Sequence, residues 1–275
     1  MRKLLTTLLI SLSFLSIQAK KNTPKPDLWP DGTQISEWFK ITKPVDLSSL
    51  GKQYKLTDHR IFADGRIHTK EIQALIDEAA QNGGGVIVVP EGTYMTGGLH
   101  FKQGTHLYLA KGATLLGSDF IGDYPLGQTR IEGETCTYFG ALINADHLDG
   151  FTISGEGTID GNGVAFMGAE LSDSYELKPV TTFDPRPHVL TLYGCKQVNL
   201  RDITVREGAY WTVHFVGCDD VVVDGVNLLN NLKIRNGDGI DIDHSRNVRI
   251  SNCHITSGDD CICLKNRREF AEYGS

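Results

Sequence analysis

No run of basic residues in this sequence is longer than a pair such as Lys20-Lys21, and the net charge is −7. Nucleic-acid-binding proteins carry a basic patch or stripe, so no nucleic-acid partner is expected. The charged fraction of 22% and the hydrophobic fraction of 40% are typical of a folded chain rather than a disordered one. An acidic protein also repels polyanions, so a site for an anionic polymer would need its own local cations.

Long apolar segments are missing as well once the first 19 residues are passed, so no membrane span is expected. Those first residues have the order of an export signal: Arg2 and Lys3, then the apolar stretch 4–17, then Ala19. The apolar stretch is too short to cross a bilayer, and a buried N-terminal helix is the alternative. We therefore expect a periplasmic or secreted protein whose signal peptide is cleaved near Ala19.

No spacing of cysteine and histidine typical of a zinc site occurs, and neither a metal nor another cofactor is expected. The chain has six cysteines, which in an exported protein can form disulfides. However, Cys195 and Cys218 precede matching strand-like runs as stacked neighbours would, and Cys261 and Cys263 alternate along one strand. Because buried cysteine behaves as a small apolar residue, we predict mostly free, buried thiols.

Hairpin signals typical of a β-sandwich are also absent, and a different repeat is present. Four short runs with alternating apolar residues begin at Phe151, Val198, Val221 and Val248, at spacings of 47, 23 and 27 residues. Units of roughly 20 to 30 residues are typical of one coil of a β-solenoid, with one face of each strand turned inward. The first spacing fits two coils with an insertion, residues 162–188, which either shapes one wall of a cleft or serves as a spacer loop.

A helix is expected before the coils. Residues 69–81 carry an apolar stripe of helical period, with Thr69 as the N-cap and the glycines at 83–85 as the end. The apolar run 86–89 follows as a buried strand. A solenoid leaves the core of its first coil open, so this helix is expected to cover it.

Three segments follow from these features. Residues 1–19 are the signal peptide, residues 20–60 are an N-terminal extension, and residues 61–275 are the β-solenoid. The extension has no strong period, and Trp29 and Trp38 are expected to pack it onto the solenoid.

Two acidic clusters lie near the end of the chain, Asn236-Gly-Asp238-Gly-Ile-Asp241 and Gly258-Asp259-Asp260. Asp238 and Asp259 are 21 residues apart, so they are expected at equivalent points of neighbouring coils, about 4.8 Å apart along the axis. Aspartate beside glycine is ordinary in turns. Two clusters at one-coil spacing, however, bring three carboxylates close together. This arrangement is energetically unfavourable, because like charges raise one another's pKa. An unfavourable cluster of this kind indicates a functional site.

These motifs, with Ser257 before the second, resemble the active-site signature of the polygalacturonase family of glycoside hydrolases, family 28. The segment from Asp64-Gly65 to Ser118 is similar to the N-terminal part of many bacterial members. The resemblance implies an all-β, right-handed, single-stranded parallel β-helix of the pectin-lyase type that hydrolyses pectic galacturonan with inversion. The family's first motif is usually Asn-Thr-Asp, and here Gly237 stands at its middle position.

Residue roles are carried over from the resemblance. Asp259 is expected to be the general acid, and Asp238 and Asp260 the bases that activate water. Asp241 falls on the second aspartate of the family motif and is expected to support the site.

Further residues near the motifs are read from the sequence itself. Lys265 is a candidate cation for an anionic sugar chain, and a surface lysine otherwise. Trp211 and His214, one coil earlier, are candidates for stacking on a sugar, with burial as the alternative. Asp243 is expected to be solvated or in a turn, and Asn236 to bond the backbone between coils.

The family's two further motifs, Gly-His-Gly and Arg-x-Lys, do not occur before Ser275. We therefore expect a fragment of a longer protein, poorly soluble and weak or inactive by itself. The expected substrate is a pectic polysaccharide or oligogalacturonide, and the expected state is a monomer. The alternatives are a rhamnogalacturonan hydrolase, a lyase that uses Ca²⁺, and a non-catalytic β-helix that binds glycan.

Overall fold

The computed structural model describes residues 28–35, 45–170, 176–179 and 185–266. The chain divides into two units, Met1–Lys40 and Ile41–Ser275. In the first unit the described residues form one short antiparallel turn, with Leu28 bridged to Gln34. The predicted signal peptide and Trp38 lie outside the described residues.

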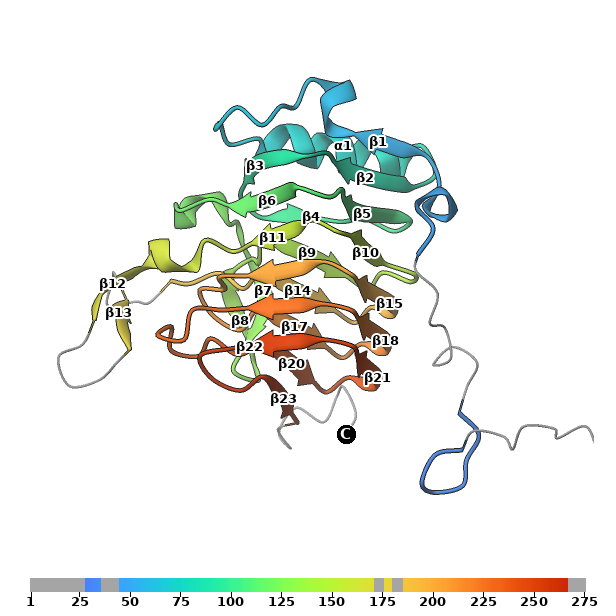
Figure 1. The fold of residues 1–275 in the computed structure, drawn as a ribbon, viewed down its shortest axis with the longest axis vertical. Coiled ribbons are helices and arrows are strands. Elements are labelled where there is room, and N and C mark those ends of the chain that lie inside the picture. Colours follow the sequence, from blue (N-terminus) through green and yellow to red (C-terminus); the bar gives the residue numbers. More distant parts are fainter. Residues whose placement is uncertain (1–27, 36–44, 171–175, 180–184, 267–275) are drawn as a thin grey trace, which may run out of the picture. The chain divides into compact units, whose positions relative to one another are not determined.

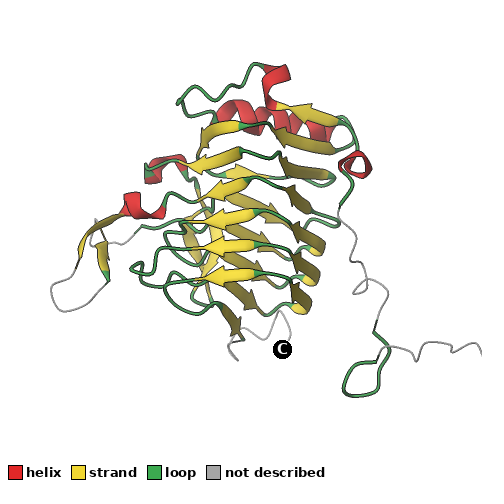
Figure 2. Cartoon of the chain, in the orientation of Figure 1, coloured by secondary structure: helices red, strands yellow, loops and turns green. Residues whose placement is uncertain are grey.

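The stacked coils of the second unit form three parallel sheets (Figures 1 and 2). Each of six coils gives one strand to each sheet, and β1 adds a further strand to the first sheet. The first sheet contains β1 Gln53–Lys55, β2 Gly85–Val89, β5 Thr105–Leu109, β10 Thr152–Gly155, β15 Lys196–Arg201, β18 Asp219–Asp224 and β21 Arg246–Ser251. The second contains β3 Gly92–Thr96, β6 Ala113–Gly117, β11 Thr158–Asp160, β16 Thr204–Arg206, β19 Asn227–Leu229 and β22 His254–Thr256. The third contains β4 Leu99–His100, β9 Ile143–Asp146, β14 Leu190–Tyr193, β17 Val213–Val216, β20 Ile240–Asp243 and β23 Ile262–Lys265. The predicted all-β parallel β-helix is confirmed.

The four repeated runs seen in the sequence are neighbouring strands of the first sheet, and they pair in register. Val198, Val221 and Val248 align with one another on β15, β18 and β21. The second apolar position of each run aligns in the same way, at Ile153, Leu200, Val223 and Ile250. These inward side chains stack along the axis and form one continuous core. Burial of this apolar surface is the main favourable contribution to folding.

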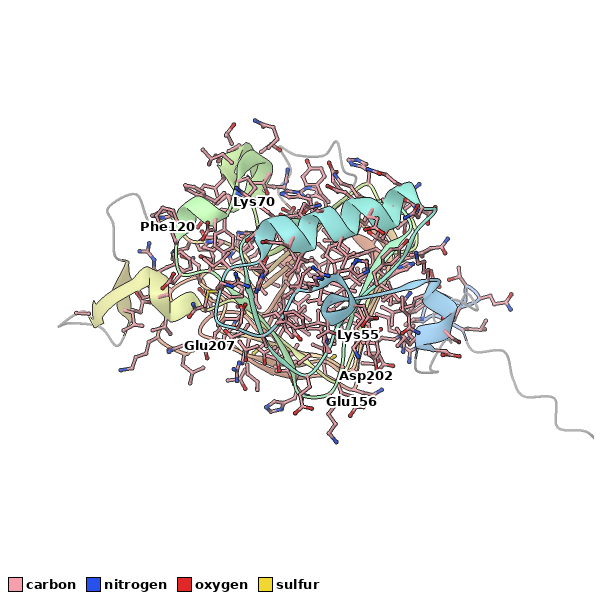
Figure 3. The ribbon with its side chains drawn as sticks, turned by 90° about the horizontal axis from the view of Figure 1, so that it is seen from above. Lys55, Lys70, Phe120, Glu156, Asp202 and Glu207 are labelled. Atoms are coloured by element: carbon pink, nitrogen blue, oxygen red, sulfur yellow. The ribbon has the colours of Figure 1, made fainter. Side chains whose placement is uncertain are left out.

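Helix α1, Thr69–Gln81, covers the first coil as predicted (Figure 3). Its apolar stripe, Ile72, Leu75, Ile76 and Ala79, is buried in the core. Thr69 is not the N-cap, because the helix begins at Thr69 and His68 precedes it without a side-chain cap. The Thr69 hydroxyl instead accepts a hydrogen bond from the backbone N–H of Gly97 at 2.6 Å.

The body begins earlier than the expected boundary at residue 61. Strand β1 already pairs with β2, and the short 3₁₀ helices η2, Leu47–Leu50, and η3, Leu56–His59, flank it. The division therefore falls at Lys40, and most of the described part of the predicted extension belongs to the first coil.

Two antiparallel hairpins leave the coils. The first, β7 Leu126–Ile131 with β8 Glu134–Phe139, follows the 3₁₀ helix η4, Ile121–Asp123. The second lies in the predicted insertion and pairs β12 Met167–Glu170 with β13 Leu177–Pro179, after η5 Gly163–Phe166. The second hairpin projects from the stacked coils, whereas the first overlaps the stack in this view (Figure 1).

The cysteines follow the prediction only in part. Cys195 and Cys218 are buried on successive coils, as their spacing indicates. Cys261 is exposed, and Cys136, Cys253 and Cys263 are half-buried, so the prediction of buried thiols is wrong for these four.

Candidate active site

The two acidic motifs meet at neighbouring strands of the third sheet. Ile240 on β20 pairs with Ile262 on β23, and the N–H of Gly239 donates to the carbonyl oxygen of Asp260 at 2.8 Å. This register aligns Asp238 with Asp260 and not with Asp259, which corrects the alignment expected from the 21-residue spacing. A carboxylate oxygen of Asp238 and one of Asp260 lie within 4.8 Å of each other.

A tight loop before β20 holds Asp238 in place. The buried amide of Asn230 donates to the hydroxyl of Thr212 at 2.5 Å and to the carbonyl oxygen of Gly237 at 3.2 Å. A Cβ atom on Gly237 would lie 2.8 Å from the carbonyl oxygen of Ile234, closer than real Cβ contacts. Glycine at the position where the family usually has threonine therefore has a local physical reason.

A hollow of about 410 Å³ opens over these motifs. Its lining residues are Glu132, Trp211, Asn236, Asp238, Asp259, Asp260, Leu264, Lys265 and Asn266. All three predicted catalytic aspartates line it. Asp238 is almost fully buried, whereas Asp259 and Asp260 are exposed. The Asp259 carboxylate accepts the N–H of Asp260 at 3.0 Å, which orients it at the rim.

Lys265 is the cation of this hollow. Its ammonium group donates to Asp238 Oδ2 at 3.0 Å, lies 3.3 Å from Asp241 Oδ1, and lies 4.3 Å from the centre of the Trp211 ring. Burial lowers the pKa of Lys265, but the hydrogen bond to Asp238 and the charges of Asp241 and Asp238 together raise it above the usual range. The prediction that Lys265 faces the groove agrees with its position in the lining.

Burial changes the pKa values of the carboxyl groups around Lys265. It raises the pKa of Asp238, an effect opposed by the hydrogen bond from Lys265 and reinforced by the charges of Asp259 and Asp260. It also raises the pKa of Asp241 to about 8, with a further contribution from the charge of Asp238. Burial therefore favours the protonated form of Asp241, beside an aspartate that Lys265 keeps closer to ionised.

Two predicted substrate-binding residues lie mainly in the interior. Trp211 lines the hollow but is only 4% exposed, and the ammonium group of Lys265 lies over its ring. His214 is fully buried, packs edge-on against Trp211 at 5.1 Å between ring centres, and does not line the hollow. The alternative of burial therefore describes His214.

Asp243 is neither solvated nor in a turn, so that expectation is wrong. It is fully buried on β20, where its carboxylate lies 2.7 Å from Arg130 Nε, 3.2 Å from His214 Nε2 and 2.6 Å from His244 Nδ1. Burial raises the pKa of Asp243, but hydrogen bonds from the two histidines and from Arg130 hold it below the usual value.

Asn236 also differs from expectation. Its side-chain oxygen accepts a long hydrogen bond from Arg186 Nη2 at 3.4 Å, rather than a backbone group of the next coil. Arg186 is buried, donates to the carbonyl oxygen of Arg235 at 2.5 Å, and lies 4.5 Å from the centre of the Tyr210 ring. Arg186 of the predicted insertion thus bonds the loop of Asn236, and the described residues of the insertion do not line the hollow.

One donor set could hold a cation. Oxygens of Asp238 and Asp260 and Cys263 Sγ lie within 4.8 Å of one another. Ca²⁺ requires six to eight oxygen ligands, so a thiol is a poor partner for it. Lys265 also already bonds Asp238. The set therefore does not fit the Ca²⁺ site that the lyase alternative requires.

Sequence reasoning missed Glu132 of the first hairpin, which lines the hollow from 106 residues before Asp238. It also missed Arg130, Asn230 and Arg186, which hold the surrounding segments. A buried arginine close to an acidic residue in an irregular segment carries no periodic signal, so only the three-dimensional structure reveals these partners.

The chain is similar to known proteins. Residues 108–271 match the model of glycosyl hydrolases family 28. A probable polygalacturonase of Vitis vinifera is 29% identical over 80% of this chain and 45% of its own length. An exo-poly-alpha-D-galacturonosidase of Dickeya chrysanthemi is 26% identical over 86% of this chain and 45% of its own.

Among solved structures, a family 28 exopolygalacturonase from Yersinia enterocolitica matches with a TM-score of 0.65 and 28% identity, over 81% of this chain and 45% of that one. The chain spans about half the length of the curated relatives it matches. Within the described residues, no helix is both long enough and apolar enough to cross a bilayer.

Proposed function

The chain belongs to family 28 of the glycosyl hydrolases, and from this premise we propose that it hydrolyses α-1,4-galacturonosyl bonds of pectic polygalacturonan by single displacement with inversion. The observation that carries the proposal is the meeting of Asp238, Asp259 and Asp260 in one hollow. The names of its relatives in grapevine and Dickeya support the substrate class.

The proposed roles divide between the two motifs. Asp238 and Asp260, whose oxygens lie within 4.8 Å, hold and deprotonate one water molecule between them. Asp259 at the exposed rim protonates the leaving oxygen. An inverting glycosidase needs its acid and base on opposite sides of the sugar, with room for water at the base. Lys265 keeps Asp238 closer to ionised, as a base must be.

Export belongs to the same proposal. Residues 1–19 act as a signal peptide, and the protein works in the periplasm or outside the cell, where pectic polymers are met.

The test combines an assay with one substitution, both carried out on a chain extended past Ser275. New reducing ends from polygalacturonate, without unsaturated products and without sensitivity to chelator, are expected, and the first product should have the inverted anomeric configuration by NMR. Asp259→Asn should lower kcat at least about 100-fold, because the leaving oxygen loses its acid. Asp149→Asn, an exposed aspartate outside the hollow, is the control. Full activity of Asp259→Asn would refute the role of Asp259, and unsaturated products would refute hydrolysis.

A further inference from the structure

A second hollow lies on the third sheet, apart from the catalytic hollow over the two acidic motifs. Its volume is about 300 Å³, and both the sheet and the β7–β8 hairpin line it. Thr191 and Tyr193 of β14 contribute from the sheet, and Gln128, Thr129 and Tyr138 contribute from the hairpin. The two hollows share no lining residue among the described parts of the chain. The second hollow is therefore a space of its own.

A covered stretch of the sheet separates the two hollows. In the third sheet, β17 and β20 lie between β14 and β23. Arg130 of the hairpin is fully buried and lies 2.7 Å from Asp243 Oδ2 on β20, and His214 on β17 lies 3.2 Å from the same oxygen. Both His214 and Asp243 are fully buried although they alternate with core residues along their strands. The second hollow is therefore not a continuation of the catalytic one.

The second hollow offers hydrogen-bonding side chains beside aromatic rings. Thr191 and Tyr193 point outward from β14, because Leu190 and Leu192, which alternate with them, are buried in the core. The Tyr193 ring centre lies 5.9 Å from that of His147, and the two rings are tilted by 46°. Sites for small molecules combine aromatic surface with a few polar groups that fix orientation. Hydroxyl and amide side chains both donate and accept, so this lining suits a ligand rich in hydroxyls.

The charges of the two linings differ. No lysine or arginine lines the second hollow within the described residues, whereas Lys265 lines the catalytic hollow. The carboxylate of Asp146 lies 2.5 Å from His147 Nδ1, and both side chains are largely exposed. An anionic ligand is favoured by local cations. A uronate ring therefore finds its cation in the catalytic hollow, and the second hollow suits an uncharged ring.

We propose that the second hollow, between the β7–β8 hairpin and strands β9 and β14, is a binding site for one uncharged sugar ring. Its volume of about 300 Å³ is at the lower end of the range for ligand sites, which matches a single ring rather than an oligosaccharide. This site goes beyond the proposed hydrolysis, and its existence does not depend on that function.

An NMR titration on a chain extended past Ser275 tests the site. D-galactose, L-arabinose and L-rhamnose are the uncharged probes, and D-galacturonate is the charged one. A single ring has few atoms, so millimolar affinity is expected. Tyr193→Ala should weaken binding of an uncharged probe at least about tenfold, and Gln128→Ala, at an exposed position, about threefold. Tyr108→Ala and Gln81→Ala, which match these residues in exposure and lie outside the hollow, should leave binding unchanged.

Lys265→Gln assigns each probe to its hollow. It should weaken binding of galacturonate and leave binding of the uncharged probe intact. Binding of the uncharged probe that disappears in Lys265→Gln but persists in Tyr193→Ala would overturn this inference. So would the absence of binding of all three uncharged probes, or galacturonate binding that Tyr193→Ala abolishes. If galacturonate does not bind while an uncharged probe does, the proposed function is weakened and this inference stands.

Discussion

The ammonium nitrogen of Lys265 lies 3.0 Å from Asp238 Oδ2 and joins β23 to the loop that precedes β20. The two residues are 27 apart in sequence, yet they share one hollow with the Trp211 ring. This contact makes a lysine part of the environment of the proposed base.

Lys265→Gln should lower kcat/KM on galacturonan by about 100-fold. Lys265 holds the pKa of Asp238 down against the effect of burial. Its loss raises that pKa further, so the acidic limb of the pH–rate profile should move to higher pH. The profile of kcat/KM against pH measures this shift, and Lys265→Arg should retain most of the wild-type limb. An unchanged limb in Lys265→Gln would show that the lysine does not act on the base.

Asp241→Asn should stabilise the protein at high pH. The pKa of Asp241 is about 8 in the folded chain, above its value of 3.8 when unfolded. The folded state therefore binds the extra proton, and its contribution to stability is complete below pH 4 and is lost as pH rises to about 8. Asp241→Asn should remove this loss, so the free energy of unfolding should rise by roughly 2–5 kcal/mol at pH 8 and change little at pH 4. Denaturant unfolding at both pH values measures it, and equal effects at the two would contradict the assignment.

Asp243→Asn should destabilise the protein by roughly 3–5 kcal/mol, because the buried guanidinium of Arg130 would lose its ion pair with Asp243. The exposed pair of Arg246 with Asp219, 2.7 Å apart, is the matched control. Asp219→Asn should cost less than about 1 kcal/mol. The double variant Arg130→Met with Asp243→Leu should recover much of the loss. Urea unfolding measures all of these variants, and a neutral Asp243→Asn would show that the hairpin is not anchored there.

Gly237→Thr should destabilise the loop before β20 and lower activity, although it restores the usual residue of the family motif. The new Cβ would lie 2.8 Å from the carbonyl oxygen of Ile234, so the backbone that carries Asp238 must shift. A loss of roughly 1–3 kcal/mol is expected. Gly127→Thr, where a Cβ meets no atom within 4 Å, is the control. A gain in both stability and kcat would mean that the loop adapts without cost.

The repeated part of the fold could be predicted because its physics is local and periodic. Val198, Val221 and Val248 each open an alternating run, and stacking aligns such runs in register. Helix α1 was predictable for the same reason, from a stripe of helical period. Its cap was not, because the Thr69 hydroxyl bonds Gly97, which is distant in sequence.

The site could be located from its two aspartate motifs but not built from them. Counting residues between Asp238 and Asp259 misaligned them by one position, since the register is set by hydrogen bonds such as Gly239 N–H to Asp260. The environment of Asp243 depends on Arg130, 113 residues earlier, and no spacing in the sequence encodes such a pairing. The position of Glu132 depends on tertiary contacts of its hairpin and not on a repeat in the sequence. Its place in the hollow therefore could not be predicted from the sequence.

The ion pair between Arg130 and Asp243 also has a consequence for the order of folding. Ribosomes add roughly 5 to 20 residues per second, so the arginine is made several seconds before its aspartate exists. A lone guanidinium is costly to bury, so the hairpin should remain in water until β20 has joined the stack. The wall of the hollow then closes only after the coil that carries the first acidic motif is in place, so an unfinished chain does not present a closed pocket.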